Sequence, residues 1–500
     1  MKTIGIIDLG SNSIRLVLVQ LGEKGNFKIV EDYKESVRLE EGMGEKGGME
    51  QDRMEHALEA LTTFKDICDG VGAEEIIATG TEALRRAANG DELLERARRE
   101  CGIDIRVLSG QEEAWYGFFG VAHSMKPEHA LLMDIGGGST ELTLVENGEL
   151  KASTSLHVGT INLNSRFGLQ GRLGPQQTSA LEEYLAKSFA GVPWLRNINC
   201  PMIIGIGGSS RTLAKIDRKR KDYPLDLQHN YEMSVEDVTA IYHQMLPLSL
   251  EQRRKIKGLS RDRADLLTGA VASMAVLMDY CHIPTMRVSA NGLREGIIYE
   301  YLNKQGIRPD DPLDFSLQSQ IYNFDLNEKH SRQVSELALS MFGQMHSLHG
   351  LHEPMARVLK TAAMMHASGL ALRYYNYPLH SFYITLNSAI NGLTQRELLM
   401  AAYVSTIHAK HDYKIDVDKY KALINREDVE SIQKLALILR LAENLDRTMC
   451  SRVDRVDVSI LGDDVVIKTT ANGRISMELR DANRSANLFK KVFKKKLLVV

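Results

Sequence analysis

The chain has 500 residues, of which 43% are hydrophobic and 25% are charged, an ordinary balance for a soluble folded protein. This length is too great for one hydrophobic core, so we expect two to four domains. The formal net charge of −3 gives no general attraction to polyanions. This excludes a broadly basic nucleic-acid-binding protein, and a polyanionic ligand would need a local basic patch.

The five cysteines are scattered and include no CxxC pair, which argues against a disulfide framework and against a zinc ribbon. We therefore expect a reducing, cytoplasmic location. The N-terminal apolar run contains Asp8 and lacks a cleavage-site pattern, so it predicts a strand and not a signal peptide. No apolar run approaches the length of about 20 residues that a membrane-spanning helix needs.

The first 125 residues predict a half-domain of mixed strands and helices. Residues 2–35 alternate like three strands, with a glycine-containing turn at 22–26. Apolar side chains then recur at helical spacing from Met54 to Ile67. The elements expected next are a strand at 76–79, a helix at 82–88 with Thr81 as its N-cap, a helix at 91–101, a strand at 105–108 and a helix from 109 to about 123.

The remaining residues predict a second half and then a change to helices. In the second half two strands flank Asn147-Gly148, a strong hairpin signal, and a helix covers 176–190. Residues 202–213 and 286–296 each predict a strand, a glycine turn and the start of a helix. A linker is expected at 310–313. Beyond it, 315–449 is almost wholly helical, and 452–480 has strand character with turns at 462–464 and 472–473.

Residues 131–141 are a second copy of residues 4–15. Each copy consists of an apolar strand, an acidic residue, a tight polar turn and a returning strand. The aligned pairs are Asp8 with Asp134, Gly10 with Gly136, and Ser13 with Ser139. Short side chains let backbone N–H groups approach an anion, and a carboxylate at a strand end can hold a cation or a water. The duplication therefore predicts a phosphate and metal cleft between two homologous halves.

Four Gly/Ser turns follow strands in the first 300 residues, at 10–13, 136–140, 205–210 and 289–292. Any tight turn after a strand favours glycine, so a single such turn is weak evidence for a phosphate loop. The alternative is a duplicated β-fold whose turns are purely structural. That alternative does not readily explain why an acidic residue ends the strand in both homologous copies.

With these motifs, the chain resembles the exopolyphosphatase / guanosine pentaphosphate phosphohydrolase family, within the actin-like ATPase superfold. The resemblance rests on motifs at 8–13, 78–85, 109–114, 134–141, 205–209 and 292–296, which occur in the family's order. It implies an α/β fold with two actin-like (ribonuclease H-like) halves, an all-α HD-like domain and a small C-terminal α+β segment. The domains expected are 1–125, 126–309, 310–450 and 451–500.

The resemblance places the catalytic base of the family at Glu113, which activates water. Glu112 is its neighbour and a second candidate, because one helix step separates the two side chains by about 100°. The apolar face of the following helix indicates that one glutamate faces the cleft and the other faces solvent. The alternative is that both are solvated glutamates favoured by the dipole at a helix N-terminus.

The resemblance also implies the groups that bind metal and phosphate. Magnesium prefers a few carboxylates together with waters and phosphate oxygens. The candidate Mg²⁺ ligands are Asp8, Asp134 and Glu141. The candidate phosphate-binding residues are Gly10, Ser11, Asn12, Ser13, Arg85, Gly136, Gly137, Gly138, Ser139, Thr140, Gly207, Gly208 and Ser209. Arg85 could instead be a surface ion-pair partner. Arg15, beside the first loop, is a weaker candidate for binding phosphate.

In the helical region the resemblance to an HD-like domain is incomplete. A metal-dependent HD site needs spaced histidines, a His-Asp pair and a later aspartate. The chain offers His330, His366, His380, His408 and Asp446, but the pair itself reads His366-Ala367, so the bridging carboxylate is absent. We expect buried histidines with satisfied hydrogen bonds, in a domain that provides a surface for the polymer or a dimer contact.

The sequence and the resemblance together predict a Mg²⁺-dependent exopolyphosphatase that releases orthophosphate from the ends of inorganic polyphosphate. The alternatives are hydrolysis of guanosine pentaphosphate in the same cleft, an actin-like kinase or ATPase, and a non-catalytic polyphosphate sensor. A homodimer is expected for the family. The terminal cluster of Lys490, Lys491, Lys494, Lys495 and Lys496 is typical of a solvated amphipathic end, and the alternative is a guide for long polyphosphate.

Overall fold

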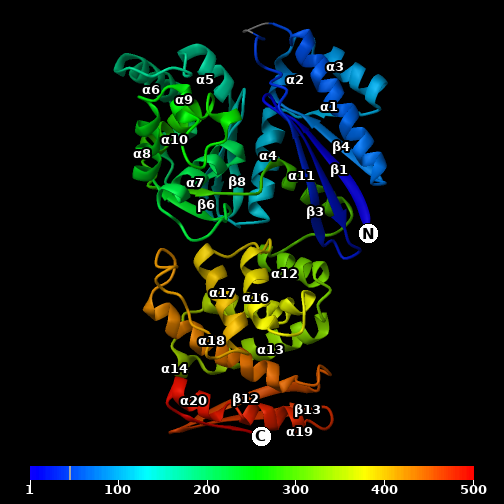
Figure 1. Cartoon of the computed structure of the whole chain (residues 1–500), viewed down its shortest axis with the longest axis vertical. Helices are drawn as coiled ribbons and strands as arrows, with labels where there is room; N and C mark the ends of the chain where they lie inside the picture. The colour runs from blue at the N-terminus through cyan, green and yellow to red at the C-terminus, as the bar shows by residue number, and fades with distance from the viewer. Residues whose placement is uncertain (44–46) are drawn as a thin grey trace. The chain divides into compact units, whose positions relative to one another are not determined.

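The computed structural model describes residues 1–43 and 47–500, and the chain forms two compact units, Met1–Asp310 and Asp311–Val500 (Figure 1). The boundary between them falls in the predicted linker at 310–313. The division of each unit into two smaller domains stays a prediction.

The first unit begins with a five-stranded sheet in the order β3-β2-β1-β4-β5. Strands β1 and β2 form an antiparallel hairpin, β3 extends it, and β4 and β5 continue the sheet in parallel from β1. The strands are β1 (Lys2–Leu9), β2 (Ile14–Leu21), β3 (Phe27–Glu35), β4 (Glu75–Gly80) and β5 (Ile105–Val107). The helices are α1 (Gln51–Gly70), α2 (Glu82–Arg86), α3 (Gly90–Arg96), the π-helical turn η1 (Ala97–Cys101) and α4 (Gly110–Ala122).

The second sheet repeats this plan. It has the order β10-β11-β9-β6-β7-β8, with β6-β7-β8 antiparallel and β9 parallel to β6. The turn at Asn147-Gly148 joins β7 to β8 with positive φ at both residues (53° and 76°), as the sequence predicts for a tight hairpin. The strands are β6 (His129–Ile135), β7 (Thr140–Glu146), β8 (Glu149–Leu156), β9 (Met202–Ile206), β10 (Tyr231–Ser234) and β11 (Thr285–Val288).

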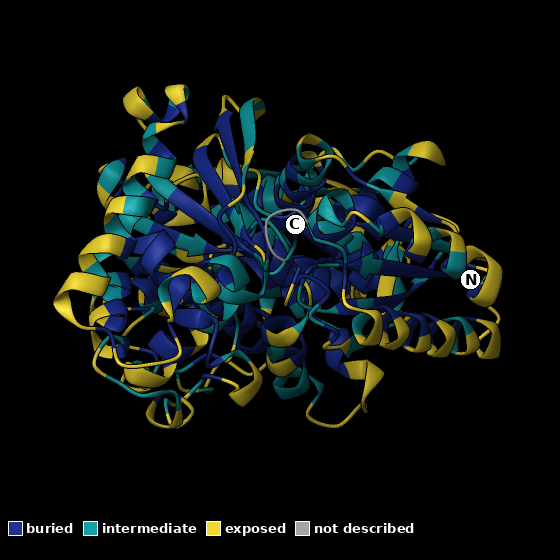
Figure 2. Ribbon diagram, turned by 90° about the horizontal axis from the view of Figure 1, so that it is seen from above, coloured by how far each residue is buried: buried dark blue, intermediate teal, exposed yellow. Residues whose placement is uncertain are grey.

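Helices follow and cover this second sheet. They are α5 (Thr160–Phe167), α6 (Pro175–Ala190), η2 (Pro193–Asn197), α7 (Gly207–Arg220), α8 (Val235–Met245), α9 (Leu250–Arg253), η3 (Arg261–Arg263), α10 (Leu267–Tyr280) and α11 (Leu293–Lys304). The predicted α/β fold with duplicated halves is confirmed, because strand order and strand direction agree in both sheets at the equivalent hairpins. Figure 2 shows the strands mostly buried and the outer helix turns exposed.

Helices α4 and α11 cross between the two sheets at very short range (Figure 1). A Cβ atom on Gly120 would lie 2.3 Å from the carbonyl oxygen of Gly292, and one on Gly296 would lie 2.1 Å from that of Tyr116. Both distances are far below van der Waals contact, so this crossing requires glycine at both positions. The crossing joins the two halves and positions the N-terminus of α4.

The second unit is helical from α12 to α18, as predicted. These helices are α12 (Pro312–Asn323), α13 (Glu328–Gln344), α14 (His346–His349), α15 (Met355–Met365), η4 (Ser368–Ala371), α16 (Tyr377–Asn387), α17 (Gln395–Ile407) and α18 (Arg426–Leu445). A three-stranded sheet and two helices complete it, namely β12 (Val453–Leu461), β13 (Asp464–Ala471), α19 (Ser476–Asn483), α20 (Ala486–Phe493) and β14 (Lys496–Val499). No helix among the described residues is long and apolar enough to cross a membrane.

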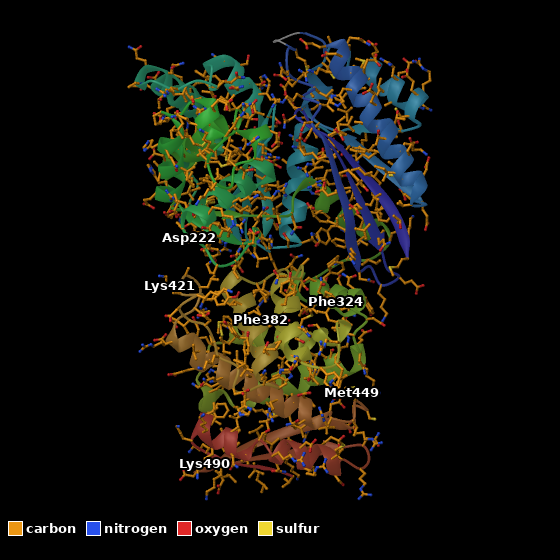
Figure 3. All side chains as sticks on the ribbon, in the orientation of Figure 1. Asp222, Phe324, Phe382, Lys421, Met449 and Lys490 are labelled. Atoms are coloured by element: carbon orange, nitrogen blue, oxygen red, sulfur yellow. The ribbon has the colours of Figure 1, made fainter. Side chains whose placement is uncertain are left out.

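Strand character predicted up to residue 480 is wrong beyond Ala471, because 476–483 forms helix α19. The buried positions there are Glu478 and Ala482, which are four residues apart as on one helix face, and Thr448 donates a hydrogen bond to the Glu478 carboxylate at 2.6 Å. The lysine cluster is amphipathic, as predicted. Phe489 and Phe493 are buried while Lys490 is exposed at the periphery of this unit (Figure 3).

Candidate active site

The two homologous turns have the same backbone geometry. In the first, the N–H of Gly10 donates to the carbonyl oxygen of Ser13 at 3.1 Å, and in the second the N–H of Gly136 donates to that of Ser139 at 2.9 Å. The turns also face each other. A Cβ atom on Gly137 would lie 2.9 Å from the Cβ atom of Ser11, so only glycine permits the second turn to approach the first this closely.

The backbone N–H groups at the tips of these turns are free to bind a ligand. Neighbouring segments bind the carbonyl oxygens, since Glu40 donates to Ser11 at 3.4 Å and Ile161 donates to Gly137 at 2.8 Å. Within the described residues, by contrast, the N–H groups of Ser11, Asn12, Gly137 and Gly138 have no backbone acceptor. Paired turns of this kind are anion-binding sites, because their donors converge on one volume.

One cleft collects most of the predicted site residues. It is lined by the predicted residues Asp8, Gly10, Ser11, Asn12, Ser13, Glu113, Asp134, Gly136, Gly137, Gly138, Ser139, Glu141, Gly207, Gly208 and Ser209. Three predicted residues do not line it, namely Glu112, Arg85 and Thr140. Thr140 is fully buried and its hydroxyl donates to the carbonyl oxygen of Val158, so its side chain has no donor left for a phosphate. The prediction that the Thr140 hydroxyl binds phosphate is therefore wrong, and a role for its backbone N–H stays a prediction.

The two neighbouring glutamates have different surroundings. Glu112 caps helix α4: its carboxylate accepts a hydrogen bond from the N–H of Ser109 at 2.8 Å and forms an ion pair with Arg106. Glu113 is the residue that enters the cleft, and its side chain is only 17% exposed. We therefore withdraw Glu112 as a catalytic candidate, because its carboxylate is already bound on the solvent side.

Arg85 acts on the cleft through Glu113. Its guanidinium donates to the Glu113 carboxylate at 2.8 Å and also to the carboxylate of Glu82 at 2.8 Å. Arg85 also donates to the carbonyl oxygen of Leu108 at 2.6 Å, which ties α2 to the strand before α4. Three acceptors already hold this guanidinium, so it orients Glu113 and is not placed as a free phosphate-binding group.

Thr81 occupies the predicted N-cap position of α2, but its hydroxyl does not cap the helix. It donates instead to the carbonyl oxygen of Leu9 at 3.2 Å. This bond links the start of α2 to the end of β1, next to the first turn.

Burial raises the pKa of four of the acidic residues that line the cleft. Desolvation raises the pKa of Asp134 to about 6 and, with the neighbouring Asp134 charge, raises that of Glu141 to about 7. The pKa of Glu113 is raised well above its ordinary value by burial and by the charge of Glu141. Burial also raises the pKa of Asp8, against the opposing effect of nearby arginines. In these four residues the effect of burial therefore outweighs that of the nearby arginines.

The duplication explains why the two aspartates differ. In the first hairpin Asp8 lies opposite Arg15, whereas in the second Asp134 lies opposite Glu141. The same strand position thus carries a cation in one half and an anion in the other. The acidic side of the cleft is consequently the side of Asp134, Glu141 and Glu113.

The acidic residues fit a magnesium ion only in an open arrangement. Within the described residues, no group of three or more His, Cys, Asp or Glu side chains is placed to hold a metal ion together. Mg²⁺ commonly takes one or two carboxylates and completes its shell with waters and phosphate oxygens. Asp8 and Asp134 are the strand-end carboxylates that suit this arrangement. Glu141 already accepts a hydrogen bond from Ser155 at 2.8 Å.

The arginines that make up the basic wall of the cleft were, apart from Arg15, not predicted from the sequence. Arg211, Arg263 and Arg294 line the cleft together with Arg15. Burial and the neighbouring charges of Arg294 and Arg15 lower the pKa of Arg211 to about 10, and neither Arg211 nor Arg263 forms an ion pair within the described residues. Arg15 and Arg294 both contact Asp32, and cations without such a partner favour an anionic ligand. The available signals were the motif Gly292-Leu-Arg-Glu-Gly296 and the arginine two residues after Ser209.

The third glycine turn, at 205–210, lies against both an acidic and a basic residue of the cleft. A Cβ atom on Gly207, where φ is +76°, would lie 2.3 Å from Oδ1 of Asp134, and one on Gly208 would lie 2.2 Å from Nη1 of Arg263. Larger residues would displace an acidic group on one wall and a basic group on the other. The turn at 205–210 therefore has a role beyond ending a strand.

The histidines of the second unit form a separate buried cluster. His330 contacts Asp446 (Nδ1 to Oδ2, 2.8 Å) and lies 3.3 Å from His366 between their Nε2 atoms. His408 is buried, and its Nε2 lies 3.6 Å from Oε2 of Glu443. Within the described residues neither ring nitrogen has a hydrogen-bond partner, so the expectation of satisfied histidines fails there. His380 is only partly buried. The HD-like character of this region stays a prediction.

Comparisons with known proteins identify the family. The model of the Ppx/GppA phosphatase family matches residues 18–305, more than half of the chain. The chain belongs to the Ppx/GppA phosphatase family. A model of domain III of the Ppx/GppA phosphatases matches residues 314–474 in the second unit.

Relatives in the family have two different names. The guanosine-5'-triphosphate,3'-diphosphate pyrophosphatase of Aeromonas hydrophila is 28% identical over 449 residues, covering 87% of this chain and 86% of that protein. A putative exopolyphosphatase of Haemophilus influenzae is 29% identical over 302 residues, covering 60% of this chain and 91% of that protein.

Solved structures agree with the fold of the first unit. An exopolyphosphatase from Cytophaga hutchinsonii is 28% identical with a TM-score of 0.57, covering 61% of this chain and 99% of that chain. The Ppx/GppA family member of Aquifex aeolicus is 28% identical with a TM-score of 0.53, covering 61% of this chain and 98% of that chain. This Ppx/GppA protein is thus a phosphatase by family, and its hydrolytic substrate is the open point.

Proposed function

We propose that this protein is a Mg²⁺-dependent exopolyphosphatase, which hydrolyses the terminal phosphoanhydride bond of inorganic polyphosphate and releases orthophosphate. The observation that carries the proposal is the composition of the cleft. Its walls combine two turns with free N–H groups and four arginines, and no aromatic residue is among the described residues that line it. A chain of phosphates needs many donors and cations, whereas a nucleotide base is usually held by stacking on a ring.

In the proposed reaction Glu113 accepts a proton from a water molecule as the water oxygen bonds to the terminal phosphorus. The bond between that phosphorus and its bridging oxygen breaks, and the electron pair leaves with the shortened chain. Arg85 holds the Glu113 carboxylate in position through its 2.8 Å hydrogen bond. The raised pKa of Glu113 makes its ionised form a stronger base than an exposed glutamate.

The turns and the basic wall bind the substrate in this proposal. The N–H groups at 11–12 and 137–138 hold the terminal phosphoryl oxygens, and Arg211 and Arg263 bind the next phosphates. A Mg²⁺ ion, when bound by Asp8 and Asp134, supplies positive charge to the phosphoryl oxygens. Ser155 donates a hydrogen bond to Glu141 at 2.8 Å, which favours the ionised form of this carboxylate.

Hydrolysis of guanosine pentaphosphate is the second candidate. It is favoured by the names of relatives that align along most of this chain, such as the Aeromonas hydrophila protein with 87% coverage. The chemistry at the terminal phosphate would be the same, and only the group beyond the phosphates would differ. The two candidates share every residue of the cleft described above.

One assay separates the candidates. Phosphate release is measured on long polyphosphate, tripolyphosphate and guanosine pentaphosphate, each with Mg²⁺ and with a chelator. We expect the highest kcat/KM on long polyphosphate and no release without Mg²⁺. A higher kcat/KM on guanosine pentaphosphate would favour the second candidate, and ATP-dependent phosphorylation of an acceptor in place of hydrolysis would reject both.

A further inference from the structure

A basic groove outside the cleft is lined by four cations, and three of them have no carboxylate partner among the described residues. The hollow has a volume of about 350 Å³ and is lined by Ile216, Lys219, Arg220, Gln244, Leu248, Gln252, Lys255, Ile256 and Lys257, which include four cations and no carboxylate. Lys219, Lys255 and Lys257 are exposed and form no ion pair within the described residues. Cations packed this closely repel one another within a Debye length, so a bound polyanion would stabilise them.

The segment that carries these lysines is held firmly in place. The buried Arg253 at the end of α9 donates to the carbonyl oxygens of Met245 at 3.1 Å and of Gly171 at 2.6 Å. Gly258, with a φ of +95°, lies so close to α7 that a Cβ atom would be 2.8 Å from the carbonyl oxygen of Lys215. The lysines between these two anchors therefore occupy a defined position beside the end of α7.

A second hollow adjoins this groove. It is lined by Glu251, Arg254, Lys255, Arg261 and Asp262, so it shares Lys255 with the first hollow. The next residue, Arg263, lines the cleft itself. Helix α7 follows a similar course, from Gly208 and Arg211 in the cleft to Lys219 in the groove. With 14 residues it spans about 20 Å.

The carboxylates near this path are mostly neutralised. Asp262 forms an ion pair with Lys34 at 2.9 Å, and Glu251 pairs with Arg254. Arg220 is the one cation of the groove that is held by carboxylates, at 3.0 Å from Asp217 and 3.1 Å from Asp237. The net excess of positive charge along the groove therefore comes from Lys219, Lys255, Lys257 and Arg261. None of these four has a carboxylate partner in the described part of the chain.

From this arrangement we infer that the groove binds the distal part of a long inorganic polyphosphate whose terminal phosphate lies in the catalytic cleft. The inference rests on the proposed function and adds a length-dependent subsite to it. Flexible lysines suit a polymer without a fixed register, since their ammonium groups act as point charges. Tripolyphosphate is too short to occupy the catalytic cleft and the groove at the same time.

The test compares two triple variants with the wild-type protein. Lys219→Gln/Lys255→Gln/Lys257→Gln removes the unpaired lysines of the groove. Lys28→Gln/Lys151→Gln/Lys187→Gln removes the same charge from exposed positions that line neither hollow. Steady-state phosphate release is measured on long polyphosphate and on tripolyphosphate over a range of salt concentrations.

For the groove variant we expect kcat/KM on long polyphosphate to fall about tenfold, which three modest ionic contacts together would produce. The slope of its logarithm against the logarithm of salt concentration should become shallower by roughly 2. On tripolyphosphate, kcat/KM and its salt dependence should be the same as in the wild type. An unchanged kcat/KM on long polyphosphate, an equal loss on tripolyphosphate, or an equal loss in the control variant would overturn the inference.

A direct binding measurement tests the groove independently of the proposed function, because it does not require hydrolysis. Titration of long polyphosphate into each protein without Mg²⁺ should give weaker affinity for the groove variant alone. If the wild-type protein released no phosphate from any polyphosphate, the proposed function would fail. The titration would still show whether the groove binds long polyphosphate. Single-stranded RNA that competes equally well per phosphate would overturn the choice of polyphosphate as the ligand.

Discussion

Replacing Glu113 with glutamine tests the central step of the proposed mechanism. The amide keeps the size of the side chain and can still accept a hydrogen bond from Arg85, but it cannot take a proton from water. A positioned general base contributes about 10² to 10⁴ in rate, equivalent to about 3 to 5 kcal/mol of activation free energy. We therefore expect kcat on polyphosphate to fall by that factor, with KM changed little.

Stability provides an independent measurement for the same variant. Burial and the charge of Glu141 raise the pKa of Glu113 in the folded protein, so the folded state disfavours its ionised form at neutral pH. A neutral amide removes this unfavourable charge, and Arg85 keeps its 2.8 Å contact with Glu82. The free energy of unfolding at pH 7 should thus be equal to or higher than that of the wild type, as measured by urea denaturation.

Glu112→Gln is the matched control, because Glu112 adjoins Glu113 on the same helix but caps its N-terminus. It should retain near wild-type kcat and lose a fraction of a kcal/mol up to about 1 kcal/mol of stability. Near wild-type turnover in Glu113→Gln, or an equal loss of turnover in both variants, would refute the assignment of Glu113 as the base.

Three further predictions follow from the site and from the helix crossing. Arg211→Gln should raise KM for polyphosphate by about tenfold or more with little change in unfolding, since a hydrogen bond to a charged group is worth about 1.5–3 kcal/mol; an unchanged KM would remove Arg211 from the substrate site. Without Mg²⁺, the thermal midpoint should fall as pH rises from about 4.5 to 7, because the unfolded chain loses the Glu141 proton before the folded protein does, where its pKa is about 7. Glu141→Gln should reduce that fall, and a midpoint with the same pH profile in both proteins would contradict it. Gly296→Ala should destabilise the first unit by about 1–3 kcal/mol, because its Cβ would lie 2.1 Å from the carbonyl oxygen of Tyr116; a melting curve identical to the wild type would show that the crossing is not this tight.

Periodicity and turn chemistry were enough to predict most elements of the fold. The hairpin at Asn147-Gly148 was predicted because two adjacent residues with positive φ favour these side chains. The segment 476–483 was misassigned because its burial depends on Thr448 and on the packing of α19 against α18, neither of which its own pattern records. Local patterns fail where tertiary contacts choose the buried face.

The sequence alone determined the duplicated turns and their acidic strand ends, since these depend on residues adjacent in the chain. Only the tertiary structure separated Glu113 from Glu112 and showed that Arg85 contacts the Glu113 carboxylate. It alone brought Arg211 and Arg263 into the cleft that Asp134 also lines. Charge and burial act through space, so the partners that set the state of an ionisable group are decided by the fold and not by spacing along the chain.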